Sequence, residues 1–171
     1  MAAHEEAQLV TDTTARELIL PDLAATGHLA RALAEQLAPG DLIGLCGPLG
    51  AGKTTLARAL IRALGAGEEE VPSPTFTLVQ TYDLRRLTLW HFDLYRLSRP
   101  DDVFELGYED ALAEAACLVE WPERLGDLLP ADRLEVTLSA PPGMADGQRR
   151  VARLRPFGDW RERVATMHVS A

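Results

Sequence analysis

The sequence predicts an α/β protein of three layers, in which a mixed parallel and antiparallel sheet lies between helices. Short apolar runs alternate with helical patterns along the chain, as expected for parallel strands joined by helices. Two successive strand-like segments with no helix between them add an antiparallel hairpin. The length of 171 residues, with 47% hydrophobic and 25% charged residues, fits one globular domain and favours neither disorder nor a membrane protein.

The N-terminal part is expected to supply a strand, a helix and a second strand. A strand over 17–20 ends at Pro21, and Thr26 is the expected N-cap of the following helix. Leucines recur every four positions on one face of that helix until a proline and a glycine stop it: Leu29, Leu33 and Leu37, then Pro39 and Gly40. The apolar run DLIGLC at 41–46 predicts a strand buried on both faces.

A second helix is expected over 53–64, with Leu56, Leu60 and Leu64 directed inward. Beyond a loop of Gly, Glu and Pro at 65–74, the expected elements follow in chain order: hairpin strands at 77–82 and 87–92, a helical segment at 98–115 broken at Gly107, a buried strand at 116–119, a short helix from Pro122, and strands at 134–139 and 150–154 around a loop at 140–148. We expect a flexible N-terminus at 1–14, one domain at 15–156 and an amphipathic tail at 157–171.

The composition limits the location and partners of the protein. No secretion signal or membrane-length apolar stretch is present, so we expect a cytoplasmic protein that does not bind membranes. A net charge of -9 argues against stable nucleic-acid binding by this chain alone. Cys46 and Cys117 lie in apolar runs without metal-ligand spacing, which indicates buried, reduced thiols.

The segment GPLGAGKT at 47–54 matches the pattern of a phosphate-binding P-loop, G-x-x-x-x-G-K-[ST]. It follows an apolar strand and opens a helix, so backbone N–H groups and the helix N-terminus can surround phosphate oxygens. We expect nucleotide binding by the loop and helix start: Gly47, Gly50, Ala51, Gly52, Lys53, Thr54 and Thr55. Of 17 basic residues 16 are Arg, and the single Lys is Lys53, which suggests a site where a guanidinium would not fit.

Two acidic residues are candidates for magnesium chemistry. Asp93 ends the apolar stretch LTLWHF and Glu120 ends ACLV, so both are expected at the carboxyl ends of strands, the edge where the P-loop lies. Asp93 fits a direct or water-mediated magnesium ligand. Glu120 fits either a second metal contact or the residue that orients the attacking water. For either carboxylate the alternative is a helix N-cap or a solvated strand end. Lys53 would neutralise the β and γ phosphates, and the Thr54 hydroxyl would bind magnesium.

The sequence favours ATP, with ADP as product, over GTP. The guanine-reading motif Asn-Lys-x-Asp of related GTPases requires Asn, and the chain contains none. The only Lys already belongs to the P-loop. The predicted fold is therefore that of a P-loop NTPase which binds ATP and Mg²⁺.

Four further motifs accompany the P-loop in a fixed order: SPTFT at 73–77, HFDLYR at 91–96, ELG at 105–107 and VEWPE at 119–123. Together they resemble the TsaE (YjeE) family, the ATPases of bacterial tRNA threonylcarbamoyladenosine biosynthesis, over residues 14 to 139. The resemblance implies a slow ATPase that supports threonylcarbamoyl transfer to tRNA, with the TsaD and TsaB proteins as partners, TsaD as the transferase and tRNA contacted through the complex. It also implies that Lys53 binds phosphates, that Thr54, Asp93 and Glu120 hold magnesium, and that 73–77 is a switch-like loop.

The family usually has an acidic residue where this chain has Pro48, and backbone phosphate contacts do not depend on it. Thr75 is the candidate in the switch-like loop that responds to the γ-phosphate, and it completes the expected catalytic set of Lys53, Asp93 and Glu120. The roles of the neighbouring motif residues are left open between site and structural functions: His91, Tyr95, Arg96 and Trp121. Nothing after Leu138 supports a site assignment.

Two other functions fit a lone P-loop domain. A small-molecule kinase would transfer the phosphate to a metabolite, but the arginine-bearing lid and substrate insertion of such enzymes are not recognisable here. A non-catalytic, nucleotide-dependent binding module would bind ATP without turnover.

Overall fold

The computed structural model describes residues 14–66, 71–141 and 147–170. Its strands are β1 (Arg16–Leu20), β2 (Leu42–Cys46), β3 (Val79–Asp83), β4 (Thr88–Asp93), β5 (Ala116–Glu120), β6 (Arg133–Ser139) and β7 (Arg150–Phe157). Its α-helices are α1 (Leu23–Gln36), α2 (Lys53–Ile61), α3 (Tyr108–Glu114) and α4 (Trp160–Thr166). Shorter helical segments are η1 (Arg62–Ala66), η2 (Pro100–Leu106) and η3 (Pro122–Leu128).

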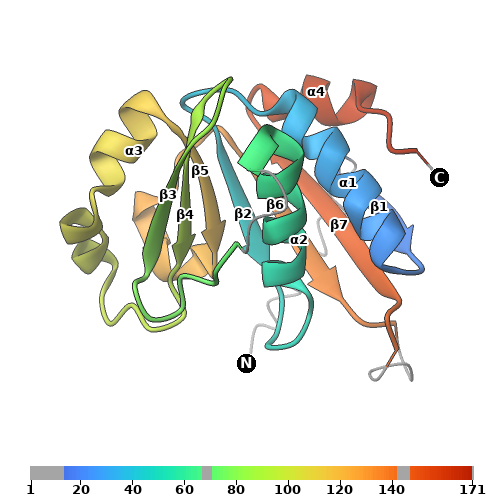
Figure 1. Ribbon diagram of the computed structural model, residues 1–171, viewed down its shortest axis with the longest axis horizontal. Helices are drawn as coiled ribbons and strands as arrows, with labels where there is room; N and C mark the ends of the chain where they lie inside the picture. Colours follow the sequence, from blue (N-terminus) through green and yellow to red (C-terminus); the bar gives the residue numbers. More distant parts are fainter. Residues whose placement is uncertain (1–13, 67–70, 142–146, 171) are drawn as a thin grey trace, which may run out of the picture.

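The seven strands form one mixed sheet in the order β1-β7-β6-β2-β5-β4-β3 (Figure 1). The central strands β6, β2, β5 and β4 run parallel, whereas β3 pairs antiparallel with β4, and β7 pairs antiparallel with both β6 and β1. The predicted mixed sheet and hairpin are thus confirmed. The parallel pairs bring the carboxyl ends of β2, β4 and β5 to one edge, which positions the site described below.

Helices cover the two faces of the sheet unequally. Figure 1 shows α1 and α2 side by side in front of the sheet, and residues of α1, α2 and α4 share one core cluster with β6, β7 and the inner face of β5. The opposite face is covered over β2, β4 and β5, where η2, α3 and η3 enclose a second cluster around Phe92 and Tyr108. On β1 the side chain of Ile19 is 62% exposed. The layer formed by η2, α3 and η3 therefore covers the parallel part of the sheet, and part of the edge strand β1 stays exposed to solvent.

The expected N-cap of α1 was wrong. Asp22 caps the helix, because its carboxylate accepts a hydrogen bond of 2.8 Å from the Ala25 N–H. Thr26 lies inside the first turns, 7% exposed, and donates its hydroxyl to the Asp22 carbonyl. The helix begins directly after Pro21-Asp22, earlier than the leucine spacing indicated.

Two further boundaries differ from those expected. Helix α2 ends at Ile61 and passes into the π-helical turn η1, in which Gly65 has φ of 106°. Strand β3 begins at Val79, two residues later than expected, because Leu78 has φ of 64° and cannot continue a strand. The break at Gly107 is confirmed, with φ of 82° between η2 and α3. The expected flexible segment 1–14 lies almost wholly outside the described residues, as do parts of the loops 65–74 and 140–148.

Both cysteines are free thiols. Burial raises the pKa of Cys117 to about 12, and burial followed by the charge of Glu135 raises the pKa of Cys46 to about 12. Thiolates are the reactive form of cysteine, so both side chains are expected to be unreactive at neutral pH.

Among the described residues, no helix has the length and apolar character needed to cross a membrane.

Candidate functional site

The loop from Gly47 to Gly52 joins the carboxyl end of the buried strand β2 to helix α2, which begins at Lys53 (Figure 1). Three glycines in it have positive φ: 131° at Gly47, 76° at Gly50 and 103° at Gly52. This conformation folds the loop around the start of the helix, where unpaired N–H groups and the helix dipole attract anions. The predicted context of strand, glycine loop and helix is confirmed.

Gly47 also lies against the end of strand β6. A Cβ atom at this position would stand 2.3 Å from the Leu138 carbonyl oxygen, so only glycine lets the loop approach the strand so closely. Gly40 offers a contrast, because it has φ of 89° but no atom within 4 Å of its absent Cβ.

Replacing Gly47 by alanine is therefore expected to reduce the free energy of unfolding more than replacing Gly40 does. Both substitutions incur the cost of a positive φ, about 1–2 kcal/mol, and only the first adds a clash with backbone. Each kcal/mol lowers Tm by about 2–4 °C in a domain of this size. Thermal unfolding of the two variants measures the difference, and equal losses would show that the contact with β6 does not constrain the loop.

The Lys53 ammonium is folded back onto its own loop. Its Nζ donates to the carbonyl oxygens of Gly47 at 2.6 Å and Pro48 at 2.8 Å, and it lies 4.0 Å from the ring centroid of Trp121. Lys53 is only 5% exposed, and burial lowers its pKa, while the charges of Glu120, Glu123 and Asp93 act in the opposite direction. A compact ammonium fits between these groups, in line with the single lysine of the sequence.

Asp93 and Glu120 lie opposite each other at the ends of β4 and β5, as predicted. Each carboxylate accepts a hydrogen bond from a threonine: Asp93 Oδ2 from Thr75 at 3.1 Å, and Glu120 Oε2 from Thr54 at 2.9 Å. Asp93 is 5% and Glu120 2% exposed. Within the described part of the chain, no lysine or arginine forms an ion pair with either of them. A bound cation would stabilise two buried carboxylates that lack an ion pair with lysine or arginine.

The Thr54 hydroxyl and the two carboxylates are hard oxygen ligands, which suit Mg²⁺. No group of three or more His, Cys, Asp or Glu side chains that could hold a metal occurs among the described residues. A magnesium ion here would thus depend on the Thr54 hydroxyl, the carboxylates, water and phosphate oxygens together, as is usual for Mg²⁺.

The switch-like loop is tied to this edge by hydrogen bonds. Ser73 Oγ and Thr75 Oγ1 lie 2.7 Å apart, and Asp93 donates its N–H to the Leu78 carbonyl at 2.9 Å. Leu78 and Trp121 have φ of 64° and 60° and are the non-glycine residues with positive φ in the described chain. Each follows a predicted site segment, and such strained residues concentrate at functional sites.

The motif residues whose roles the sequence left open take different positions. The ring centroids of Trp121 and Tyr95 lie 4.9 Å apart with the rings tilted by 46°, and Trp121 lies beside Lys53. Arg96 does not line the pocket: its guanidinium lies 4.6 Å from the ring centroid of Phe76, which is 83% exposed. His91 is fully buried and contacts Glu120.

A pocket of about 280 Å³ brings the predicted residues together. Lining residues come from the P-loop, the switch-like loop and the ends of β4 and β5: Leu49, Gly50, Ala51, Gly52, Lys53, Thr54, Thr55, Thr75, Asp93, Tyr95, Glu120 and Trp121. Gly47 lies outside this lining and holds the base of the loop.

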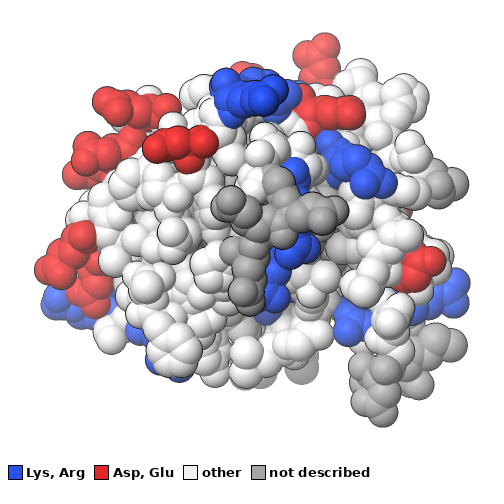
Figure 2. All heavy atoms as spheres, viewed as in Figure 1, with Lys and Arg blue, Asp and Glu red and all other residues white. Residues whose placement is uncertain are grey.

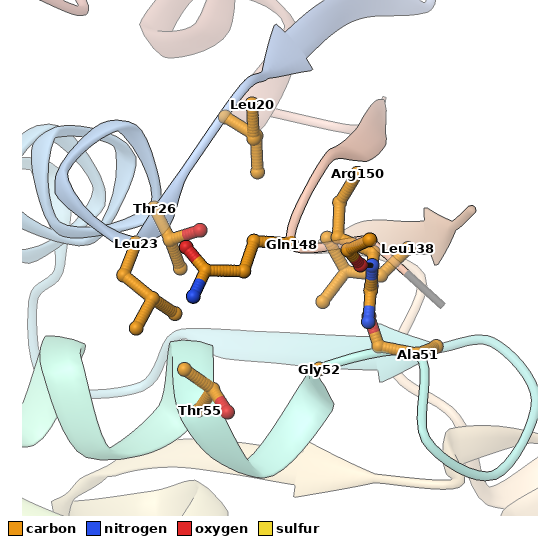
Figure 3. A pocket seen from close by; sticks show the side chains of 10 residues that line it. Leu20, Leu23, Thr26, Ala51, Gly52, Thr55, Leu138, Gln148 and Arg150 are labelled. Atoms are coloured by element: carbon orange, nitrogen blue, oxygen red, sulfur yellow. Dashed lines mark hydrogen bonds between the residues drawn. The ribbon is translucent and has the colours of Figure 1, made fainter. Parts of the chain in front are cut away.

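A second pocket of about 280 Å³ adjoins the first on the other side of the P-loop and shares Ala51, Gly52 and Thr55 with it. Figure 3 shows the Gln148 side chain reaching across this pocket toward Thr26 and Leu23. Further lining comes from Leu20, Leu138 and Arg150, and Arg150 Nε donates to the Ala51 carbonyl at 3.0 Å. Sequence reasoning missed Gln148 and Arg150, because they lie outside every motif.

The glycine loop with its lysine and threonine, set between a parallel strand and a helix of this sheet, makes the protein a P-loop NTPase in fold. YdiB of Bacillus subtilis, a solved structure, has the same architecture, with a TM-score of 0.66 and 26% identity over 88% of this chain and 91% of that one.

A family model described as threonylcarbamoyl adenosine biosynthesis protein TsaE matches residues 20–151. The tRNA threonylcarbamoyladenosine biosynthesis protein TsaE of Rickettsia felis is 43% identical over 121 residues, which is 71% of this chain and 71% of that protein. Its counterpart in Treponema pallidum is 37% identical over 131 residues, 76% of this chain and 91% of that protein. The chain belongs to the TsaE family.

Proposed function

We propose that this protein binds ATP and Mg²⁺ at the P-loop, hydrolyses ATP slowly, and thereby supports threonylcarbamoyladenosine modification of tRNA. In this proposal the TsaD and TsaB proteins are its partners, and TsaD performs the transfer. The observation that carries the proposal is the convergence of Lys53, the pair Thr54 and Glu120, and the pair Thr75 and Asp93 on one pocket.

The P-loop supplies the phosphate contacts of the proposed site. Backbone N–H groups of the loop and the first turn of α2 would donate hydrogen bonds to the phosphate oxygens. Lys53 can exchange its bonds to the Gly47 and Pro48 carbonyls for bonds to phosphate oxygens with a small movement of its side chain. Because burial disfavours the isolated ammonium, the phosphate charge stabilises it.

The carboxylates supply metal and water placement. Bound Mg²⁺ would neutralise charge on the β- and γ-phosphates. Thr54 and Asp93 are the proposed ligands, directly or through water, and Glu120 is either a further ligand or the group that orients the attacking water. The hydrogen bond between Thr75 and Asp93 links the switch-like loop to the same place, so loss of the γ-phosphate can be transmitted to residues 73–77.

The second pocket is the proposed place of the nucleoside. It continues from the P-loop through Ala51 and Gly52, and it combines apolar walls with a few polar groups, as nucleotide-binding pockets do. Leu20, Leu23 and Leu138 can pack on the faces of a purine, and the Gln148 amide can meet its edge (Figure 3).

The positions of the arginines support the proposal of slow turnover. Fast phosphoryl transfer usually needs a further cation at the γ-phosphate besides the P-loop lysine and Mg²⁺, and an arginine supplied by a partner can add about 10³ to 10⁵-fold. Arg96, the internal candidate, packs on Phe76 outside the pocket. The exposed Leu49 and Phe76 beside the pocket offer apolar surface to a docking protein.

The acidic net charge of the chain supports the proposal that tRNA is contacted through the complex and not by this chain alone. Figure 2 shows several acidic side chains over the α3 side of the face in view, and both acidic and basic ones on the rest of it. With a net charge of -9, the chain is not expected to bind nucleic acid stably by itself.

Single-turnover phosphate release with MgATP, with and without the TsaB and TsaD proteins, tests the proposal. We expect slow release alone, a changed rate with the partners, and loss of that change in Arg96→Ala and Thr75→Ala. GTP in place of ATP should bind more weakly. Transfer of phosphate to a metabolite would favour a kinase, and ATP binding without release would favour a non-catalytic module.

A further inference from the structure

His91 is a buried polar residue that the proposed function does not use. It lies on β4 two residues before Asp93, so both side chains share the face that α2 covers. Its exposed fraction is 0%, which excludes direct contact with solvent. An apolar residue would fill the same space without the cost of burying an imidazole.

The imidazole makes one polar contact among the described residues. Its Nε2 lies 2.9 Å from Glu120 Oε1, and its Nδ1 is buried without a hydrogen-bond partner there. An ionised Glu120 can only accept, and the contact then requires the proton on Nε2. The other oxygen, Oε2, accepts from Thr54 at 2.9 Å. Each oxygen of Glu120 thus has its own hydrogen-bond partner, one on β4 and one on α2.

Without this contact Glu120 would have an alternative partner. Glu120 exerts the largest of the carboxylate charge effects on Lys53, whose ammonium lies in the same pocket. A carboxylate released from His91 can rotate toward that ammonium and occupy the place of a phosphate. The hydrogen bond with His91 opposes this rotation, because rotation of the carboxylate would leave a buried imidazole N–H unpaired.

We propose that His91 is a positioning residue, which fixes the Glu120 carboxylate beside Thr54 for metal and water placement and keeps it away from Lys53. This inference rests on the proposed function, since it concerns the orientation of Glu120, one of the two carboxylates of the proposed metal site. Residues that orient ligands in this way typically change metal affinity or activity 10 to 100-fold when they are replaced.

Two replacements separate positioning from packing. His91→Phe fills the space and removes the donor, whereas His91→Gln places an amide N–H at a similar reach. We expect His91→Phe to lower kcat about 10 to 100-fold and to raise the Mg²⁺ concentration needed for half-maximal hydrolysis, while ADP affinity measured in EDTA stays within about threefold. His91→Gln should recover most of the loss. His28→Phe is the matched control, because its Nδ1 is also buried without a partner but lies on α1.

A double-mutant cycle and a spectrum complete the test. If His91 acts through Glu120, then His91→Phe should have little further effect on kcat in a Glu120→Gln background. In the metal-free wild type, ¹⁵N NMR of the imidazole should show the proton on Nε2. Equal losses in the Phe and Gln variants, additive effects in the cycle, or a proton on Nδ1 would overturn the inference. A wild-type protein that fails to hydrolyse ATP would overturn the proposed function as well.

Discussion

Replacing Lys53 by alanine is expected to lower ATP affinity by at least about 100-fold, below detection by calorimetry. Lys53 is the only lysine of the chain, and its Nζ is already held at the mouth of the loop by two carbonyls. Charge-assisted hydrogen bonds contribute about 1.5–3 kcal/mol each, and the phosphates would lose at least one and the accompanying charge. Backbone dipoles alone then face the phosphate groups.

Two variants make this result interpretable. Arg62→Ala removes a positive charge from an exposed position just beyond α2, outside the pocket, and should leave ATP affinity unchanged. Lys53→Arg keeps the charge but brings a planar group into the space between the carbonyls and Trp121, so we expect it to weaken binding too. Undiminished affinity in Lys53→Ala would refute the P-loop assignment.

Asp93→Asn is expected to remove Mg²⁺-dependent hydrolysis, with kcat reduced about 100-fold or more, because a neutral amide is a poorer ligand for a hard cation. Hydrolysis measured over a range of Mg²⁺ concentrations distinguishes this variant from Glu120→Gln. The Glu120→Gln substitution should lower kcat more than ATP affinity, since Glu120 is proposed to act on metal or water in the transition state.

The control for Asp93→Asn is Asp83→Asn, because Asp83 is also hydrogen-bonded to a threonine and lies in the same hairpin. Asp83 Oδ1 accepts from Thr88 at 3.2 Å, as Asp93 does from Thr75, but it ends β3 and lies outside the pocket. Asp83→Asn should leave hydrolysis intact. If Asp93→Asn kept its magnesium dependence, Asp93 would be a structural residue.

Local patterns in the sequence were sufficient to predict most of the fold and the centre of the site. The P-loop motif, and acidic residues at the ends of apolar runs, placed Lys53, Asp93 and Glu120 on one edge, because parallel strands end together. The position of Thr26 was wrong because leucine spacing marks the buried face of a helix but not its first residue. Asp22, directly after a proline, was the available signal.

Contacts between distant segments could not be predicted in the same way. Arg150 reaches the P-loop and Gln148 lines the pocket beside it because β7 pairs with β1 and β6, and no local pattern specifies that register. The contact of His91 with Glu120 likewise depends on the pairing of β4 with β5. Strand alternation places His91 on the same side of β4 as Asp93, but its hydrogen-bond partner could be found only from the structure.

The pairing of β1 with β7 has a consequence for biosynthesis. Leu20, early in the chain, stands opposite Arg150 in the register, and both line the second pocket. Strand pairs that are far apart in sequence form slowly, and during translation they must wait for the later strand to leave the ribosome. A nascent chain that ends before β7 would already contain the glycine loop but not the wall beside it. We therefore expect nucleotide to stabilise the protein only after β7 has been synthesised and paired.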